Sequence, residues 1–251
     1  MHLMPELCKV PSAVRPLKAP EDTTHRVRAL DVGAGVGRVT SDVLLHLVDD
    51  VVLIEPVEKF VQEAFERGTA SAAGTLIEDK SHAIWKGIRD KSKSVTFVQG
   101  TLQALDPAHP LASEDCKLLG RVGHIPSEDD IDSKFDVIWC QWCLGHLTDD
   151  DLVPFFKRCR AALRESGKSL IIVKENLCQE AADGTGRESF DESDSSLTRY
   201  SACPIWSISV LTYWTFRSDG SWKRAFRAAG LTLVHEQIQH GFPEGLYEVR
   251  M

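Results

Sequence analysis

The sequence lacks the features of three functional classes. No Lys/Arg-rich block occurs in a chain of formal net charge −8, so the basic footprint of a nucleic-acid-binding protein is missing. No stretch reaches the ~18 apolar residues that a membrane span requires, and the first twenty residues contain no apolar core of signal-peptide length. We therefore expect a soluble protein of the cytoplasm, present also in the nucleus, that binds neither nucleic acid nor a membrane.

The spacing of a zinc site is missing as well. The chain has seven cysteines, and without a secretory signal these are expected to be reduced thiols. Cys140 and Cys143 form a lone CxxC that no second pair accompanies. We therefore predict no metal site, and apolar packing is the default for both thiols.

Mainly apolar runs alternate with amphipathic segments along the chain. The apolar runs are residues 26–33, 51–55, 94–100, 135–142 and 168–176. Such continuous runs are typical of central parallel strands that are buried on both faces. Apolar residues at helical spacing fall near residues 39–47, 60–65, 149–163 and 221–229. The alternation predicts a doubly wound α/β fold.

We predict one domain over residues 26–251, preceded by a short N-terminal segment, 1–25. Three stretches within the domain look like insertions, at about 68–93, 106–134 and 200–216. Residues 106–134 are polar, contain proline and show no sustained period, so we expect either a disordered segment or a surface excursion there.

The stretch "LDVGAGVGR" places three glycines, Gly33, Gly35 and Gly37, between the first predicted strand and the first helix. Such a turn permits positive φ values and close approach of a ligand to the backbone. The spacing is G-x-G-x-G, and Arg38 stands where a dinucleotide fingerprint requires Gly or Ala, which disfavours an NAD-dependent oxidoreductase. Glu55 ends the second predicted strand, where a carboxylate accepts both ribose hydroxyls of a nucleoside. The alternative interpretation is an ordinary tight turn between a strand and a helix.

This arrangement resembles the class I S-adenosylmethionine-dependent methyltransferases, whose first motif has the same glycine spacing and whose second strand ends in an acidic residue. The resemblance implies a Rossmann-like fold with a seven-stranded, mostly parallel sheet and helices on both faces, and S-adenosyl-L-methionine as the cofactor. Leu102 and Gln103, in "GTLQAL", follow the third predicted strand, the segment that flanks the adenine in that class.

The segment "FDVIWCQWCLGHLTDDDL" is more specific. It resembles the fourth strand and following helix of the eukaryotic protein N-terminal α-N-methyltransferases. The resemblance is to a fungal-type member. This family methylates the α-amine of proteins beginning X-Pro-Lys or X-Pro-Arg. "IIVKEN", "DSSLTR" and "FPEGLYEVR" are similar to later motifs of this family. Within the segment, the spacing of Thr148 to Asp151 also predicts a capping box at the start of the helix.

The resemblance implies three sets of site residues in this sequence. Cofactor contacts fall on Gly33, Gly35, Gly37, Arg38, Glu55, Pro56, Val57, Leu102, Gln103 and Gln141. Substrate contacts fall on Trp142, Asn176, Asp191 and Ser196. The catalytic pair falls on His146 and Asp194.

The chemistry of the reaction agrees with these roles. An α-amine of pKa ~7.7–8.0 needs only about 1 kcal/mol to lose its proton at pH 7, against roughly 4–5 kcal/mol for a lysine, so one modest base is sufficient. His146 follows the carboxyl end of the fourth predicted strand, where ligands of open α/β sheets bind. We expect Asp194 to take up or stabilise the amine proton, Asn176 to hold the backbone of the first substrate residue, and Asp191 to attract the third-position lysine. Trp142 is expected to line the site for the second-position proline.

Two departures from the family pattern keep other functions open. The chain reaches its first predicted strand by about Arg26, without the aromatic-bearing N-terminal helical segment of the family. Residues 200–216, an uncharged aromatic and β-branched run, separate "DSSLTR" from "SDGSW", and we hypothesise a retained in-frame intron there, with a genuine surface or membrane-touching insertion as the alternative. The competing functions are a small-molecule methyltransferase and a non-catalytic relative that binds cofactor or peptide.

Overall fold

The computed structural model describes residues 26–76, 83–112, 114–125, 127, 134–165, 167–180, 187–191, 213–241 and 247–251. The predicted N-terminal segment, 1–25, lies outside these residues. The chain forms two compact units. Unit 1 comprises Met1–Gln141 and Arg158–Ile172, and unit 2 comprises Trp142–Lys157 and Val173–Met251.

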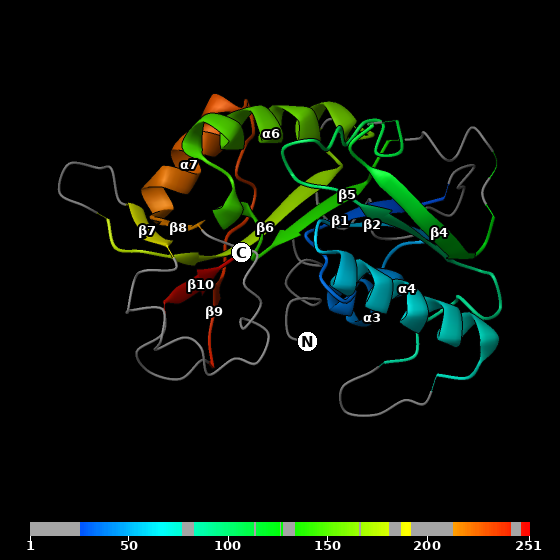
Figure 1. Cartoon of the computed structure of the whole chain (residues 1–251). Helices are drawn as coiled ribbons and strands as arrows, with labels where there is room; N and C mark the ends of the chain where they lie inside the picture. The colour runs from blue at the N-terminus through cyan, green and yellow to red at the C-terminus, as the bar shows by residue number, and fades with distance from the viewer. Residues whose placement is uncertain are drawn as a thin grey trace. The chain divides into compact units, whose positions relative to one another are not determined.

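Unit 1 contains a mainly parallel sheet (Figure 1). Its strands lie in the order β4 (Lys117–Gly123), β3 (Ser94–Gln99), β2 (Asp50–Glu55), β1 (Arg28–Val32) and β5 (Val137–Gln141). β1 pairs in parallel with β2 and β5, and β2 pairs in parallel with β3. Every residue of β1 and β2 is buried, which explains their apolar runs. Four of the five predicted parallel strands are therefore confirmed in unit 1.

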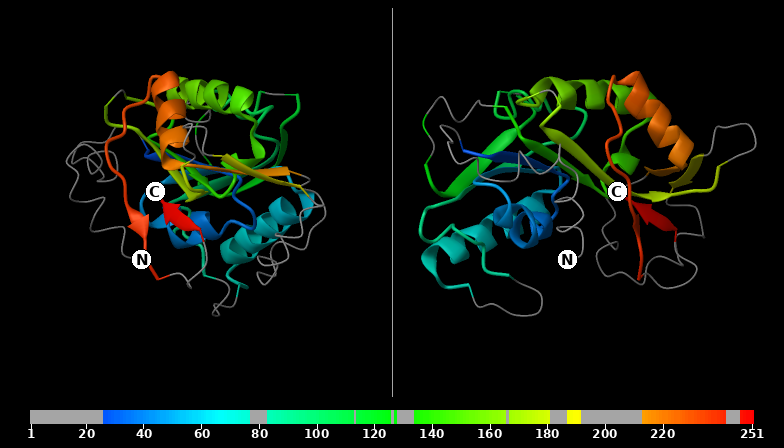
Figure 2. Two further views of the ribbon diagram at one scale, coloured as in Figure 1. Left: turned by 90° about the vertical axis from the view of Figure 1, so that its left-hand side faces the viewer. Right: turned by 180° about the vertical axis from the view of Figure 1, so that it is seen from behind.

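Helices cover both faces of this sheet (Figure 2). α3 (Arg38–Asp42), a 3-10 turn η1 (Leu44–His46) and α4 (Glu58–Ala73) lie on one face, and the last turns of α6 (Asp149–Ala162) lie on the other. The predicted first helix is interrupted, because Val43 leaves the helical region at φ −126° and ψ −64°.

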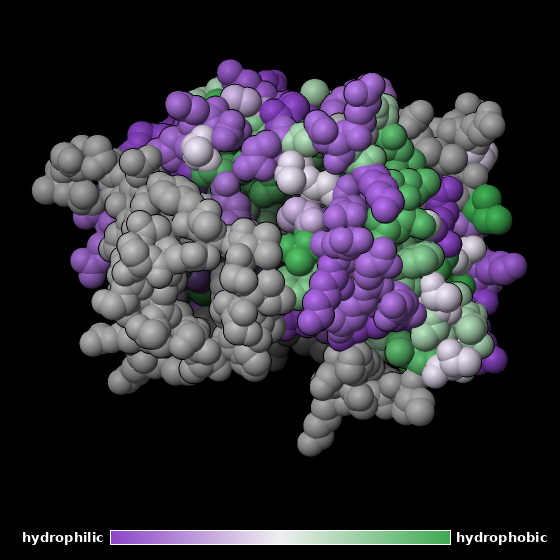
Figure 3. Space-filling view, in the orientation of Figure 1, coloured by the Kyte–Doolittle hydropathy of each residue, from purple (hydrophilic) through white to green (hydrophobic). Residues whose placement is uncertain are grey.

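The surface over α4 agrees with its amphipathic pattern. Figure 3 shows a hydrophilic surface over the first turns of the helix, where Glu58, Lys59 and Glu66 are exposed. Val61 and Ala64 are fully buried on its other side. The helix therefore stabilises unit 1 through the burial of one apolar stripe.

The boundary predicted at residue 68 falls inside α4, which continues to Ala73. The helix needs a glycine at position 68 because it packs closely against Phe97 of β3 there. A Cβ on Gly68 would stand 2.8 Å from the Phe97 ring. Trp85 and Ile88, also within the predicted insertion, are 2% and 1% exposed. Much of residues 68–93 thus belongs to the core of unit 1.

Residues 106–134 contain a strand that their sequence did not predict. β4 pairs antiparallel with β3, with a register shift between Phe97 and Val98. Its burial pattern is mostly exposed or half-buried, so no apolar run marks it. The first alternative, a disordered segment, is wrong for Lys117–Gly123, whereas the second, a surface excursion, is compatible with this largely exposed strand.

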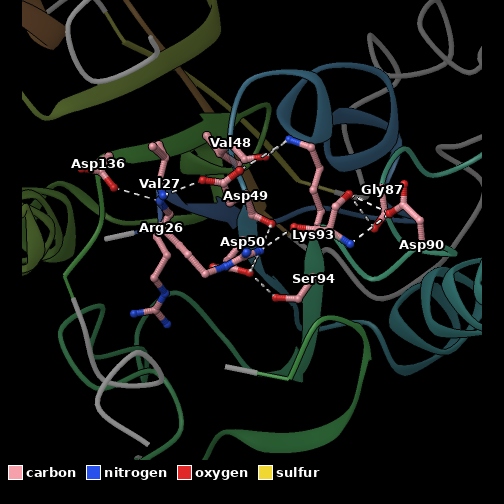
Figure 4. Close-up of polar contacts among 12 residues, drawn as sticks. Arg26, Val27, Val48, Asp49, Asp50, Gly87, Asp90, Lys93, Ser94 and Asp136 are labelled. Carbon is pink, nitrogen blue, oxygen red and sulfur yellow. Dashed lines mark hydrogen bonds and ion pairs between the residues drawn. The ribbon is translucent and has the colours of Figure 1, made fainter. Parts of the chain in front are cut away.

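A polar network joins the amino ends of the strands in unit 1 (Figure 4). The Asp50 carboxylate accepts hydrogen bonds from Arg26 Nε at 2.7 Å and from Ser94 Oγ at 2.6 Å. Asp136 accepts from the backbone N–H of Arg28 at 2.8 Å. These bonds satisfy buried polar groups at the amino ends of the strands. The candidate site lies at the opposite, carboxyl ends.

Unit 2 is built around β6 (Leu170–Leu177), which begins in unit 1. β10 (Glu248–Arg250) pairs antiparallel with β6, and β9 (Ile238–Gln239) pairs antiparallel with β10. β7 (Arg187–Asp191) pairs antiparallel with β8 (Tyr213–Arg217), which meets β6 in parallel at Leu177. The end of the predicted 200–216 insertion therefore belongs to a paired strand; residues 200–212 lie outside the described residues.

α7 (Asp219–Ala228) completes unit 2. The Trp222 and Phe226 rings of α7 stack at 6.2 Å, and Phe156 meets Phe226 edge-on at 5.2 Å. Ser218 caps α7 by accepting from the N–H of Ser221 at 3.2 Å. This aromatic cluster holds α7 against α6 within unit 2.

The seven strands expected of the fold are present among the described residues as β1, β2, β3, β5, β6, β9 and β10. β4, β7 and β8 are additional. In the described part of the chain no helix combines the length and hydropathy needed to cross a bilayer. The same residues contain no cluster of three metal-binding side chains. Cys140 and Cys143 are 0% and 4% exposed, as expected for apolar packing.

Candidate active site

The carboxyl ends of the strands in unit 1 finish at the same level. The parallel register pairs Val32 with Ile54 on one side and with Cys140 on the other. Glu55 and Gln141 therefore stand on either side of Gly33, the first residue after β1. Ligands of open α/β sheets bind beyond this edge, and the predicted cofactor residues gather at it.

The glycine turn adopts the conformation that only glycine takes easily. Gly33, Gly35 and Gly37 have φ values of 62°, 57° and 80°. A Cβ on Gly37 would stand 3.0 Å from the Trp85 ring, so this glycine also allows the turn to pack on the core. Apart from its two neighbours in the chain, no described residue has an atom within 4 Å of where a Cβ on Gly35 would stand. The backbone of Gly35 is thus the part of the turn that a ligand can approach.

Glu55 ties the glycine turn to the end of β2. Its Oε2 accepts the N–H of Gly35 at 2.8 Å, and its Oε1 accepts the N–H of Val57 at 2.9 Å. Burial raises the pKa of Glu55, and the two backbone bonds counteract that shift. Each carboxylate oxygen keeps a second lone pair, so Glu55 can hold the turn and still accept ribose hydroxyls.

Asp31 lies beneath the turn and was not predicted as a site residue. It is 1% exposed and accepts a 2.6 Å hydrogen bond from the Thr40 hydroxyl. The pKa of Asp31 is raised to about 7. Burial is the main cause, the negative charge of Glu55 adds to the rise, and the Thr40 hydrogen bond opposes it. Its position in "LDVG", directly before the first glycine, is the signal that could have identified it.

The segment after β3 is held from α6. Arg158 Nη2 donates to Leu102 O and Arg158 Nε donates to Leu105 O, each at 3.1 Å. Leu102 is 7% exposed, whereas Gln103 is exposed. Leu102 thus packs in the core of unit 1, while Gln103, next to it in the chain, is open to solvent. Arg158 was not predicted, because the pairing of α6 with this segment depends on the fold.

The remaining predicted cofactor residues surround the same strand ends. Arg38 is exposed at the start of α3, and Pro56 is exposed just after β2. Val57 precedes α4 as its N-cap residue. Gln141 Oε1 accepts from the Trp139 indole N–H at 3.3 Å.

Trp142 opens unit 2 in a strained conformation. Its φ of 52° is positive, which is rare for a bulky residue. Its backbone N–H donates to Lys174 O at 3.0 Å, and Lys174 Nζ lies 4.7 Å from the ring centroid. The buried indole N–H has no hydrogen-bond partner among the described residues. Strain of this kind concentrates at functional sites.

His146 ends the 3-10 turn η2 (Leu144–His146), between β5 and α6. Half of the predicted capping box is present: Thr148 Oγ1 accepts the N–H of Asp151 at 3.2 Å, but the Asp151 carboxylate accepts from the Thr148 hydroxyl at 2.7 Å, where a full box has it accept from the Thr148 backbone N–H. Asn176 is half-buried near the carboxyl end of β6. His146 thus follows the carboxyl end of β5, and Asn176 lies near the carboxyl end of β6, as predicted.

The acidic substrate segment is only partly described. Asp191 ends β7, where its backbone pairs with Tyr213. Asp194 and Ser196 lie outside the described residues, so their assignments stay predictions.

The residues of unit 1 fit an adenosyl ligand: an approachable Gly35 backbone, a carboxylate level with the turn, and the Leu102–Gln103 segment. Solved structures with a similar fold are also methyltransferases. A solved SAM-dependent methyltransferase of Leishmania major aligns with a TM-score of 0.54 at 24% identity, covering 98% of this chain and 72% of that one. A Burkholderia thailandensis N1-methyltransferase solved with S-adenosylhomocysteine aligns with a TM-score of 0.56 at 16% identity, covering 99% and 76%. The fold is that of the S-adenosylmethionine-dependent methyltransferases.

Sequence comparison identifies the family. Residues 13–204 match the AdoMet dependent proline di-methyltransferases. The chain is 31% identical over 223 residues to alpha N-terminal protein methyltransferase 1 of Schizosaccharomyces pombe, covering 89% of this chain and 69% of the relative. It is 30% identical to the protein of that name in Arabidopsis thaliana, covering 89% and 57%. It is 31% identical to N-terminal Xaa-Pro-Lys N-methyltransferase 1 of Danio rerio, covering 88% and 69%. This chain belongs to that family.

Proposed function

We propose that this protein transfers methyl groups from S-adenosylmethionine to the α-amine of proteins with an exposed X-Pro-Lys or X-Pro-Arg N-terminus. The observation that carries the proposal is the family match over residues 13–204, which includes both the glycine turn of unit 1 and His146 of unit 2. The names of the relatives from Schizosaccharomyces pombe and Danio rerio support the choice of a protein N-terminus as the substrate.

Unit 1 would hold the cofactor. Glu55 accepts the ribose hydroxyls, the Gly35 backbone allows close approach, and Leu102 and Gln103 flank the adenine. When bound, S-adenosylmethionine supplies an electrophilic methyl group on a sulfonium.

Unit 2 would remove the proton and hold the peptide. His146 acts as the general base that takes a proton from the α-ammonium, with Asp194 stabilising the charge. The freed nitrogen lone pair forms the new N–CH₃ bond as the S–CH₃ bond breaks. Asn176 binds the backbone of the first residue, Trp142 contacts the proline, and Asp191 with Ser196 binds the cationic third residue.

A methylation assay tests the proposal. The wild-type protein is incubated with S-adenosylmethionine and a peptide beginning Ala-Pro-Lys, and methyl groups are located by mass spectrometry. The matched control is the same peptide with an acetylated α-amine, which should accept none. Transfer to the lysine side chain, or none to either peptide while S-adenosylmethionine binds in calorimetry, would contradict the proposal and favour a non-catalytic relative. Transfer to small amines but not to peptides would favour the small-molecule enzyme.

We also propose a cytoplasmic and nuclear location. The support is the thiol-rich composition, seven cysteines with no second pair to the CxxC, which suits a reducing compartment. Microscopy of the tagged protein in its own host tests this, and a secreted or vesicular pattern would contradict it.

A further inference from the structure

The segment from Cys143 to Asp149, called here the His146 segment, is held by a buried carboxylate. Glu175 of β6 is 3% exposed. Its Oε1 accepts the backbone N–H of Cys143 and that of Leu144, each at 2.9 Å. Hydrogen bonds to a charged acceptor are stronger than those between neutral groups. Glu175 therefore fixes the residues that enter the η2 turn.

A buried guanidinium holds the same segment from its other side. Arg217, the last residue of β8, is 2% exposed. Its Nη1 donates to Leu144 O at 3.3 Å, its Nη2 donates to Leu147 O at 2.6 Å, and its Nε donates to Asp149 Oδ1 at 2.9 Å. The three donors of one rigid fork thus span the residues on both sides of His146.

Arg217 is itself held in place. Its backbone pairs with Leu177 of β6, and its O accepts the N–H of Cys178 at 3.3 Å. The ring of Trp222 lies 5.4 Å from its guanidinium carbon. A side chain whose backbone and stem are both constrained loses little further entropy when it binds the segment.

The burial of a carboxylate and a guanidinium in unit 2 is not explained by stability alone. Removing a carboxylate and a guanidinium from water is unfavourable, and apolar residues of similar size often stabilise a core better. Burial raises the pKa of Glu175 to about 7, while the N–H groups of Leu144 and Cys143 and the charge of Arg217 lower it. The hydrogen bonds of both side chains go to the His146 segment, four of them to its backbone.

We propose that Glu175 and Arg217 are positioning residues that fix the backbone on both sides of His146 and thereby the direction of its imidazole toward the substrate amine. The inference rests on the proposed function, because it concerns the proposed general base. Asn176 follows Glu175 directly in β6, so the same strand that anchors the segment also presents the proposed ligand of the peptide backbone. Neither residue contacts the substrate in this proposal.

The test compares Glu175→Leu, Glu175→Gln and Arg217→Met with wild type in the peptide assay. Glu175→Leu and Arg217→Met should lower kcat at least about tenfold, because small displacements of a catalytic group have large kinetic effects, and should change both KM values less than about twofold. Glu175→Gln keeps an Oε1 that accepts both N–H groups, so it should restore most of kcat. The control is Arg164→Met, since Arg164 also bonds a carboxylate, Asp136 at 3.1 Å, and a backbone carbonyl, but in unit 1.

A second readout does not depend on activity. Amide hydrogen exchange should become faster in residues 143–149 of Glu175→Leu and Arg217→Met and stay unchanged in β1. If Arg217→Met does not fold, Arg217→Lys replaces it, because one ammonium cannot span both carbonyls and Asp149. If the wild type is active and Glu175→Leu and Arg217→Met keep its kcat, this inference is overturned but the proposed function is not. The same holds if Arg164→Met loses as much kcat as they do. An inactive wild type that binds S-adenosylmethionine would overturn the proposed function, and the inference with it.

Discussion

The carboxylate of Glu55 and the backbone N–H of Gly35 are joined by a 2.8 Å hydrogen bond, across twenty residues of sequence. The bond sets the position of the glycine turn above the sheet and places the carboxylate next to Gly35, where a Cβ would meet no other residue within 4 Å apart from its chain neighbours. A change at either residue should therefore alter cofactor binding more than it alters the fold.

Glu55→Gln should weaken S-adenosylmethionine binding about 10- to 100-fold, because the amide nitrogen cannot accept a backbone N–H or a ribose hydroxyl and a hydrogen bond to a charged group contributes about 1.5–3 kcal/mol. Isothermal titration calorimetry measures the affinity. Glu58→Gln, an exposed change one turn away in α4, is the control and should bind as wild type does. Equal affinity of the two variants would refute the role of Glu55.

Gly35→Ala and Gly37→Ala should separate binding from stability. Both place alanine at a positive φ, which costs roughly 1 kcal/mol of folding free energy. At Gly37 the new methyl would also stand 3.0 Å from the Trp85 ring, so this variant should lose more stability. At Gly35 the methyl enters open space beside Glu55, so this variant should lose more affinity for S-adenosylmethionine. Thermal melts should show Gly37→Ala as the less stable variant, and calorimetry should show Gly35→Ala as the variant that binds S-adenosylmethionine more weakly.

The buried Asp31 makes stability depend on pH. Its folded pKa is raised from 3.8 to about 7, so its contribution is fully present below the unfolded value and is lost as pH rises through about 7. Between pH 4 and 7 the free energy of unfolding should fall by up to about 1.4 kcal/mol per pH unit from this group. Asp31→Asn should make that fall shallower in urea titrations, with the Glu175 contribution remaining. The exposed change Asp115→Asn is the control; a slope equal to that of Asp31→Asn would contradict the prediction.

His146→Ala and Asp194→Asn should lower turnover by about 100-fold or more, the usual contribution of a general base. Affinity for S-adenosylmethionine should stay within about twofold of wild type, because neither residue is a proposed cofactor contact. His235→Ala, an exposed histidine of unit 2, is the control and should keep full activity. Normal activity of Asp194→Asn would remove it from the proposed catalytic pair.

The retained-intron hypothesis for residues 200–216 is tested on messenger RNA. Spliced transcripts should join the codon of Arg199 to that of Arg217, and reads that cover the segment continuously in most transcripts would contradict this. The deletion removes Tyr213–Phe216 of β8 but keeps Arg217, whose guanidinium holds the His146 segment. We therefore expect a protein without residues 200–216 to be active in the peptide assay.

The sequence predicted best where one side chain pattern has one structural solution. The apolar runs of β1 and β2 correspond to strands buried at every position, and Thr148 accepts the N–H of Asp151 at the start of α6, as their spacing indicates. β4 was missed because an exposed edge strand needs no apolar run. Gly68, where the predicted insertion begins, weakens a helix by itself, yet it lies inside α4, because its lack of a side chain lets the helix approach Phe97.

The sequence by itself determined the doubly wound class of the fold, the glycine turn with its carboxylate, and the family, because these depend on local pattern and on motifs along the chain. The tertiary structure decided that Arg158 supports the Leu102 segment and that Glu175 and Arg217 hold both sides of His146. The reason is physical: each of these charged side chains bonds backbone groups at least thirty residues away in sequence. Backbone N–H and C=O groups are the same in every residue but proline, so such partners leave no mark in the sequence.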